Sequence, residues 1–191
     1  MEQNKEMTAQ ESLKLISETL NNSRRDILRN NAKYYVLWGC LLTVFSLVVY
    51  FLWHITGKAS WNFLWFLMPV VGFPLAALLH KKDGVVPQSF VGNLTGQVWC
   101  VFAAFSLSLS ALAAFVVPIP MTLTIIIMLG MAESITGVIL KNWPIIIGGF
   151  ILGVGGAVAA TMLRTEAQML LFTLGGVILA ATGLIVKLQN K

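Results

Sequence analysis

Six long apolar stretches follow one another along this chain, and they constrain its fold more than any other feature of the sequence. Each stretch has about 20 residues, which at ~1.5 Å per residue lets a helix cross ~30 Å of hydrocarbon. The loops between them are short, so successive helices must run in opposite directions. The sequence therefore predicts an all-α, polytopic membrane protein whose six transmembrane helices form three sequential hairpins, over residues 34–54, 61–80, 94–117, 119–140, 143–163 and 167–187.

The composition agrees with this prediction and limits the classes of partner. Hydrophobic residues make up 57% of the chain and charged residues 11%, whereas a soluble domain carries about 25% charged residues. The 191 residues leave room for one bundle at 33–191 and one cytoplasmic N-terminal segment at 1–32. The net charge of +5 comes from bases near the ends of the apolar stretches, where they contact lipid headgroups. We therefore expect the lipid bilayer as a partner and no nucleic acid.

The basic residues also predict the orientation in the membrane. If the N-terminus is cytoplasmic, eleven basic residues lie on the cytoplasmic side and only Lys58 and Arg164 lie on the other side. Because cytoplasmic loops carry an excess of Lys and Arg, this asymmetry predicts a multi-pass plasma-membrane protein with both termini in the cytoplasm. The eleven cytoplasmic bases are Lys5, Lys14, Arg24, Arg25, Arg29, Lys33, Lys81, Lys82, Lys141, Lys187 and Lys191.

Small residues in the fifth and sixth stretches predict how the helices meet. Gly149 and Gly153 form a G-x-x-x-G pattern in the fifth stretch, and the sixth carries Gly175, Gly176 and Gly183. Helices in lipid associate largely through close packing at such residues. We therefore expect these two helices to pack tightly against each other within one chain. The alternative is a contact between two copies in a homo-oligomer.

Pro69, Gly72 and Pro74 lie near the middle of the second stretch. Each proline lacks a backbone donor and crowds the preceding turn, so we expect this helix to kink. Kinked helices line binding cavities in some transporters, but prolines are also common in membrane helices. The kink alone therefore does not predict transport.

Glu133 is the only acidic residue inside an apolar stretch. At ~1.5 Å per residue from the turn at Pro118 and Pro120, it lies roughly 21 Å below the outer surface, too deep for its side chain to reach water easily. No Lys or Arg lies at that depth, so we expect the carboxyl to face the bundle interior and to carry a proton. The hydroxyl groups at plausible heights to contact it belong to Thr182, Ser106 and Ser108.

This intramembrane polar site allows two interpretations. In the first, Glu133 is a proton or cation site of a small transporter or channel. In the second, it is a protonated acid that bonds a neighbouring hydroxyl group and has a structural role. Transport proteins usually carry several intramembrane polar groups, and this chain offers one acid. We therefore favour the structural interpretation.

The N-terminal segment carries the pattern of an amphipathic helix. Thr8-x-x-Glu11 is a capping box, which predicts a helix start. An apolar stripe follows at spacings of three, four and seven residues, and Asn21-Asn22-Ser23 interrupts it. We expect a short cytoplasmic helix, an elbow at this interruption, and a second helix that enters the membrane. The stripe must be covered by the membrane surface, by the bundle itself or by a cytoplasmic protein partner, and its residues are Leu13, Ile16, Leu20 and Ile27.

No pattern of catalytic residues occurs in the chain. There is no phosphate-binding glycine loop and no zinc-binding or metalloprotease spacing, and Cys40 and Cys100 lie inside apolar stretches. We therefore expect no enzyme activity, no cofactor and no metal ion. The sequence favours a non-enzymatic accessory or scaffold protein that presents its N-terminal helix in the cytoplasm. The alternative is a small transporter or channel that uses Glu133.

Overall fold

The computed structural model describes residues 8–81 and 90–189, and all regular elements within these ranges are helices. The expected turn at Asp83, Gly84 and Pro87 lies outside the described residues, as do Lys5, Lys82 and Lys191. The elements are α1 (Ala9–Thr56), the 3-10 helix η1 (Ala59–Phe66), α2 (Leu67–Lys81), α3 (Phe90–Phe115), α4 (Met121–Leu140), α5 (Trp143–Phe150), the π-helix η2 (Ile151–Gly155), α6 (Gly156–Met162) and α7 (Met169–Gln189).

Six helical segments are long and apolar enough to cross a membrane, which confirms the all-helical prediction for the described residues. The second segment combines η1 with α2, and the fifth combines α5, η2 and α6. The boundaries agree closely with those expected; α4, for example, covers Met121–Leu140 where the sequence predicted 119–140. The six apolar helices indicate a multi-pass membrane protein.

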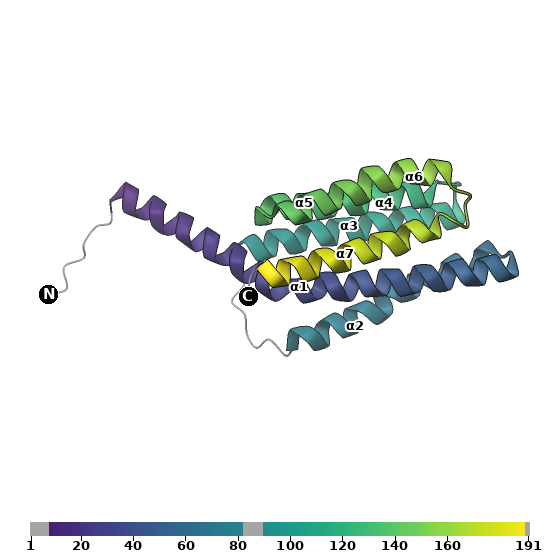
Figure 1. Ribbon diagram of the computed structural model, residues 1–191, viewed down its shortest axis with the longest axis horizontal. Helices are drawn as coiled ribbons and strands as arrows, with labels where there is room; N and C mark the ends of the chain where they lie inside the picture. Colours follow the sequence, from purple (N-terminus) through teal and green to yellow (C-terminus); the bar gives the residue numbers. More distant parts are fainter. Residues whose placement is uncertain (1–7, 82–89, 190–191) are drawn as a thin grey trace.

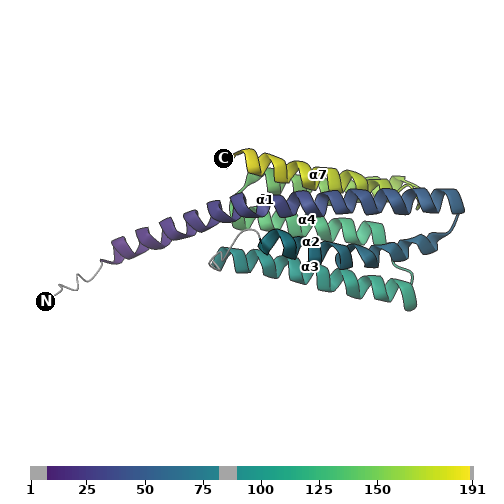
Figure 2. The ribbon, with the colours of Figure 1, turned by 90° about the horizontal axis from the view of Figure 1, so that it is seen from below.

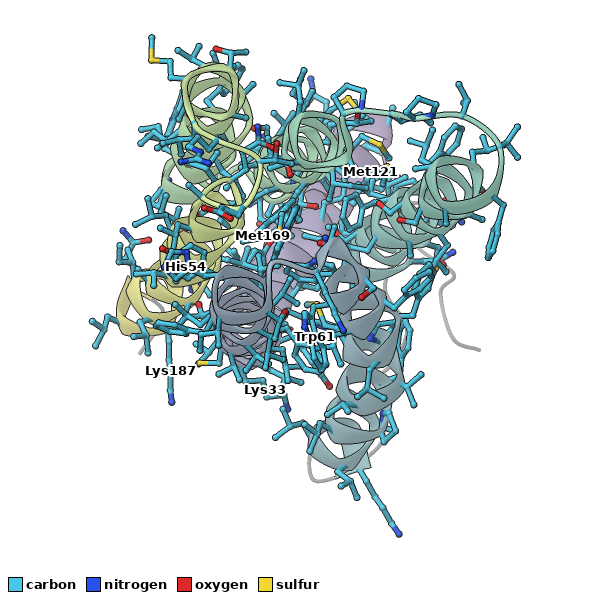
Figure 3. The ribbon with its side chains drawn as sticks, turned by 90° about the vertical axis from the view of Figure 1, so that its right-hand side faces the viewer. Lys33, His54, Trp61, Met121, Met169 and Lys187 are labelled. Carbon is cyan, nitrogen blue, oxygen red and sulfur yellow. The ribbon has the colours of Figure 1, made fainter. Side chains whose placement is uncertain are left out.

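The helices form one elongated bundle in which α1 is much longer than the rest (Figure 1). The first part of α1 extends beyond the bundle at one end, and α7 ends near the place where α1 enters the bundle (Figure 2). Seen along the helices from the end that carries Trp61, Met121 and Met169, α1 lies between α7 and α2, and α3 lies at the edge (Figure 3). The first and last apolar helices are therefore neighbours.

The prediction of a short N-terminal helix followed by an elbow is wrong. α1 is a single helix of 48 residues that runs through Asn21-Asn22-Ser23 and across the expected boundary at residue 32. Its start is as expected: Thr8 Oγ1 accepts a hydrogen bond from the Glu11 amide at 3.3 Å, and Glu11 Oε2 accepts one from the Thr8 amide at 2.9 Å. The polar residues cost a helix only ~0.7 kcal/mol each or less, and contacts described below outweigh this cost.

The contact between α1 and α7 is built on small residues. A Cβ added to Gly39 would lie 2.5 Å from both the Ala180 nitrogen and the Gly176 oxygen, so the two backbones touch here. Farther along the helices, the hydroxyls of Ser46 and Thr173 share a hydrogen bond of 2.8 Å. The buried residues of α1 recur every three or four positions, as in antiparallel helix pairs that pack along a narrow seam: Ala32, Tyr35, Gly39, Leu42, Ser46 and Val49.

The glycines of the fifth segment pack against α4 more closely than against α7, which corrects the expected pairing of the fifth and sixth helices. A Cβ on Gly130 would overlap the backbone of Gly153, and a Cβ on Gly149 would overlap the Ser134 side chain. The contact between the fifth segment and α7 is less close, because Gly175 of α7 faces the flexible end of the Leu152 side chain and not a backbone. The small residues in the sequence therefore predict that backbones come into contact, but they do not predict which helix each residue contacts.

The irregularity of the second segment lies before its prolines and not between them. The chain is a 3-10 helix up to Phe66 and becomes α-helical at Leu67, two residues before Pro69. Pro74 lies inside α2. Gly72 provides space for the ring of Trp38, since a Cβ there would lie 2.5 Å from two ring atoms. α2 thus rests on α1 through an aromatic side chain.

The buried residues concentrate in α1, α4, the fifth segment and α7. In α3, by contrast, only Val91 and Thr95 are buried, and both lie in its first two turns. Most large apolar side chains of α3 face outward, as expected of a helix whose surroundings are lipid. The four-helix centre of the bundle is therefore where a buried site can form.

Candidate functional site

Glu133 lies in the four-helix centre and has no exposed surface. It belongs to the buried face of α4, which also includes Ile126, Gly130 and Gly137 at spacings of three and four residues. The expectation that Glu133 faces the interior is therefore met. A buried carboxyl needs polar partners, so the groups around it decide what the site can do.

Three further helices contribute to the surroundings of Glu133. A Cβ on Gly148 of α5 would lie 3.1 Å from Glu133 Oε1 and 3.0 Å from Thr182 Oγ1 of α7. From α1, the buried Tyr35 side chain is directed toward Thr136, which lies one turn from Glu133 on α4. Glu133, Tyr35, Thr136 and Thr182 are all buried, and we call them the polar cluster.

Some donors and acceptors of the polar cluster have no hydrogen-bond partner among the described residues. The Thr136 hydroxyl donates to the Ala132 carbonyl at 2.8 Å. Within the described part of the chain, neither carboxyl oxygen of Glu133 nor the Tyr35 hydroxyl has a hydrogen bond of good geometry, although the Thr182 hydroxyl lies beside the carboxyl at Gly148. Leaving such a group unpaired costs about 1–3 kcal/mol. Native proteins rarely carry three such atoms in one place without a reason.

The structure brings together some, but not all, of the residues expected around Glu133. Thr182 belongs to the cluster, as its height in the membrane suggested. Ser108 does not, because it is exposed and its hydroxyl donates to the Ala104 carbonyl at 2.8 Å. Ser106 has a buried hydroxyl without a partner among the described residues, but it lies on the peripheral α3.

Sequence reasoning missed Tyr35. Its position near the end of an apolar stretch suggested an aromatic ring at the lipid interface. The signal that identifies it is the spacing within α1, because Tyr35 falls on the same buried seam as Gly39 and Leu42. The neighbouring Tyr34 is only half-buried and carries the Lys33 ammonium over its ring at 5.2 Å.

A second candidate site is the part of α1 that lies outside the bundle, residues 9–19, which we call the N-terminal arm. Leu13 and Ile16 on the arm are 66% and 56% exposed. Leu20, where the helix reaches the bundle, is half-buried, and Ile27 is buried. The structure thus divides the expected docking face, because its second half is already covered by the chain itself.

Arg24 fastens the base of the arm. Its Nε donates to the main-chain oxygen of Ile139 at 3.0 Å, and its guanidinium also donates to Asn21 Oδ1 at 3.2 Å. Ile139 lies in the last turn of α4, where carbonyl groups lack partners within the helix and a positive charge is favourable. This contact ties α1 to the end of α4 directly after the polar residues that were expected to break the helix.

No three His, Cys, Asp or Glu side chains gather as metal ligands would in residues 8–81 and 90–189. Comparison with protein-family models, with curated proteins and with solved structures finds no match to this chain. The interpretation of function therefore depends on the polar cluster and the N-terminal arm themselves.

Proposed function

We propose that this chain is a non-enzymatic accessory or scaffold protein of the plasma membrane that presents its N-terminal arm to a cytoplasmic protein partner. The bundle anchors the arm, and both termini lie in the cytoplasm. The proposal combines the apolar bundle, the distribution of charge between its two ends, and the geometry of α1.

The charge distribution supports this orientation. Lys33, Lys81, Lys141 and Lys187 all lie at the end of the bundle from which the arm projects. Lys58 and Arg164 lie toward the other end, near the pair formed by His54 and Glu166 at 3.8 Å. An excess of Lys and Arg is typical of the cytoplasmic side.

The single observation that carries the proposal is that the arm continues the first apolar helix without a break. Leu13 precedes Lys33 by 20 positions, which is about 30 Å along a helix at ~1.5 Å per residue, and the arm is inclined to the bundle, so most but not all of this length is height (Figures 1 and 2). The polar layer of a bilayer adds only about 5–8 Å beyond the hydrocarbon on each side. If the bundle stands across the membrane, the exposed Leu13 and Ile16 side chains lie beyond the headgroups, where a protein and not lipid would cover them.

The spacing of the apolar residues favours an amphipathic helix as the partner. Leu13, Ile16 and Leu20 follow each other at three and four residues, which is the a–d–a pattern of a coiled-coil seam. Such a face binds a second helix or a helix-binding groove. Lys14, Glu11 and Glu18 lie on the other faces of the arm and are suited to water.

The test replaces two residues of this face and compares them with a matched control. Leu13→Ser with Ile16→Ser removes the apolar face, whereas Leu15→Ser removes a leucine that is 54% exposed on the opposite side of the same helix. A photo-crosslinking residue at Ser12 or Ser17 in intact cells identifies proteins beside the arm. We expect specific adducts that disappear in the double variant and persist in Leu15→Ser. Equal adducts in all three proteins, or adducts only with lipid, would contradict the proposal.

A second candidate function is supported by the buried, unpaired carboxyl of Glu133. Ionisable groups inside a membrane protein frequently mark a proton or ion pathway. A small transporter or channel of this kind would give proton or solute flux in reconstituted vesicles. Glu133→Gln would reduce that flux, and removal of the arm would leave it unchanged. The absence of flux in vesicles that contain folded protein would exclude this candidate.

A further inference from the structure

We propose that Glu133, Tyr35 and Thr182 form a buried proton-binding site, and that the proton held there maintains the packing of α4 against α1, α5 and α7. The ligand is a proton carried by the Glu133 carboxyl. This inference is independent of the N-terminal arm and of its partner.

The charged groups of the surrounding helices do not neutralise Glu133. α5 contains no titratable side chain, and the titratable groups of α1 next to Tyr35 in sequence are Tyr34 and Lys33. Lys33 is directed toward α2, where its Nζ donates to the Leu79 carbonyl at 3.4 Å, and Lys187 of α7 is exposed. On α4 itself, Lys141 is exposed beyond the last turn. Among the described residues, a proton is therefore the positive charge that the carboxyl can acquire.

The space around the carboxyl excludes a hydrated cation on the side of α5. A single carbon atom added to Gly148 would already lie 3.1 Å from Glu133 Oε1 and 3.0 Å from Thr182 Oγ1. An ion with even one water molecule needs more room than a carbon atom. The hollow between Lys58 and Leu67 and the one between Glu11 and Glu18 include no residue of the polar cluster.

A protonated carboxyl satisfies the unused groups of the cluster, whereas an ionised one does not. The acid is a donor through its O–H and an acceptor through its other oxygen. It can donate to Thr182 Oγ1, which lies beside it at Gly148, and its other oxygen can accept from a hydroxyl group of the cluster. Loss of the proton to water leaves a carboxylate with no countercharge in an apolar interior, and water must then enter to solvate it.

The first test measures thermal unfolding of the purified full-length protein in detergent from pH 5.5 to pH 9.5. We expect the unfolding temperature of the wild type to fall by several degrees as the pH rises from 5.5, because the unfolded chain releases the Glu133 proton in the ordinary carboxyl range whereas the folded state retains it; the curve should level off where the folded state also releases the proton. Glu133→Gln keeps a donor and an acceptor without the charge, so its unfolding temperature should stay constant over this range. Glu18→Gln, on the exposed arm, is the matched control and should behave like the wild type.

Two results of this experiment would overturn the proposal. One is a wild-type curve that does not depend on pH or that rises with pH. The other is a Glu133→Gln variant that fails to fold while Glu18→Gln folds, since this would mean that a charged and coordinated carboxylate is required. The series is repeated in sodium chloride and in choline chloride at equal ionic strength. Stabilisation of the wild type by sodium alone, absent from Glu133→Gln, would identify a metal-cation site instead.

The second test detects the proton chemically. A hydrophobic carbodiimide reacts with a protonated carboxyl: the acid proton moves to a carbodiimide nitrogen, and the carboxyl oxygen bonds to the central carbon. The adduct then rearranges to a stable N-acylurea, which mass spectrometry locates. We expect modification at Glu133 in the wild type that decreases as the pH rises, and none at that position in Glu133→Gln. If Glu133 is not modified at any pH, while exposed Asp and Glu side chains of the same sample are modified at low pH, Glu133 is not protonated.

Discussion

Gly130 of α4 and Gly153 of the π-helix η2 bring two backbones into direct contact, because any Cβ on Gly130 would overlap the Gly153 nitrogen and Cα. Neither backbone can move away without separating the two helices. Glycine is therefore required at position 130 by its neighbour and not by its own backbone angles. This contact lies one turn from Glu133 and holds α4 against the fifth segment.

The first prediction concerns this contact. Gly130→Ala should lower the free energy of unfolding by about 1–3 kcal/mol, the usual cost of forcing an extra group into a packed interior. Gly96→Ala is the matched control, because a Cβ there meets nothing within 4 Å and alanine favours a helix by about 1 kcal/mol over glycine. Unfolding in mixed detergent measures both. Equal stability of the two variants would show that the helices do not meet at Gly130.

The hydrogen bond between Ser46 and Thr173 gives the second prediction. It joins α1 to α7 at 2.8 Å within the apolar part of the bundle. A double-mutant cycle with Ser46→Ala and Thr173→Val should give a coupling energy of about 0.6 kcal/mol, the average for such bonds between membrane helices. Strict additivity of the two single variants would indicate that the bond is absent in solution.

The third prediction concerns the base of the N-terminal arm. Arg24→Gln removes the bond to the Ile139 carbonyl and a positive charge at the end of α4. Amide hydrogen exchange within residues 9–24 should become faster, since the arm loses its fastening to the bundle. Arg25→Gln removes the same charge from an exposed neighbour and should leave the exchange unchanged. Similar acceleration by both variants would mean that charge alone, and not the contact, stabilises the arm.

The capping box at the start of α1 predicts a dependence on acid. The hydrogen bonds that the Thr8 amide and hydroxyl donate to Glu11 lower the pKa of this carboxyl below its ordinary value of 4.5. A lowered pKa means that the cap stabilises the helix above the ordinary value and is lost as the pH falls through the lowered value. The protection of the first-turn amides, measured as exchange relative to the intrinsic rate at each pH, should therefore decrease only below about pH 4.5, and Glu11→Gln should reduce this dependence. A loss of protection between pH 7 and pH 5 would point to another group.

The last prediction tests the orientation of the bundle. Single cysteines at Lys58 and Lys81, in a background where Cys40 and Cys100 are alanine, should react with a membrane-impermeant reagent from opposite sides. Both lysines are exposed at helix ends, so neither substitution disturbs the core. Lys58→Cys should label in intact cells, and Lys81→Cys only after the membrane is opened. Equal labelling of both in intact cells would reject the proposed topology.

The sequence predicts the six helical segments well because the length of an apolar stretch and the prolines that end it are local properties. Pro118 and Pro120, for example, place the start of α4 within two residues of its observed start at Met121. The elbow in α1 was wrong for the opposite reason. Asn21 has only a weak local preference against helix. The bond from Arg24 to Ile139, which lies 115 positions later in the chain, is a tertiary contact that the local sequence does not reveal.

The candidate site was predictable only in part. The depth of Glu133 in its apolar stretch indicated a buried carboxyl, and the same argument selected Thr182. The contribution of Tyr35 depends on which face α1 turns toward α4, and that rotation is set by the glycine contacts between α1 and α7. Small residues are alike in sequence, so Gly149 and Gly153 did not reveal that α4 and not α7 was their closest neighbour.

The continuity of α1 has a mechanical consequence. α1 changes direction where it leaves the bundle, but its helical backbone is unbroken, so a force applied to Leu13 passes along the helix into the bundle (Figures 1 and 2). The helix is held against α7 at Gly39 and against the end of α4 by Arg24, which makes this end of the bundle its fulcrum. A load on the arm would therefore tilt or twist the remainder of α1, including Tyr35. In engineering terms, α1 is a lever whose inner end carries a residue of the buried polar cluster.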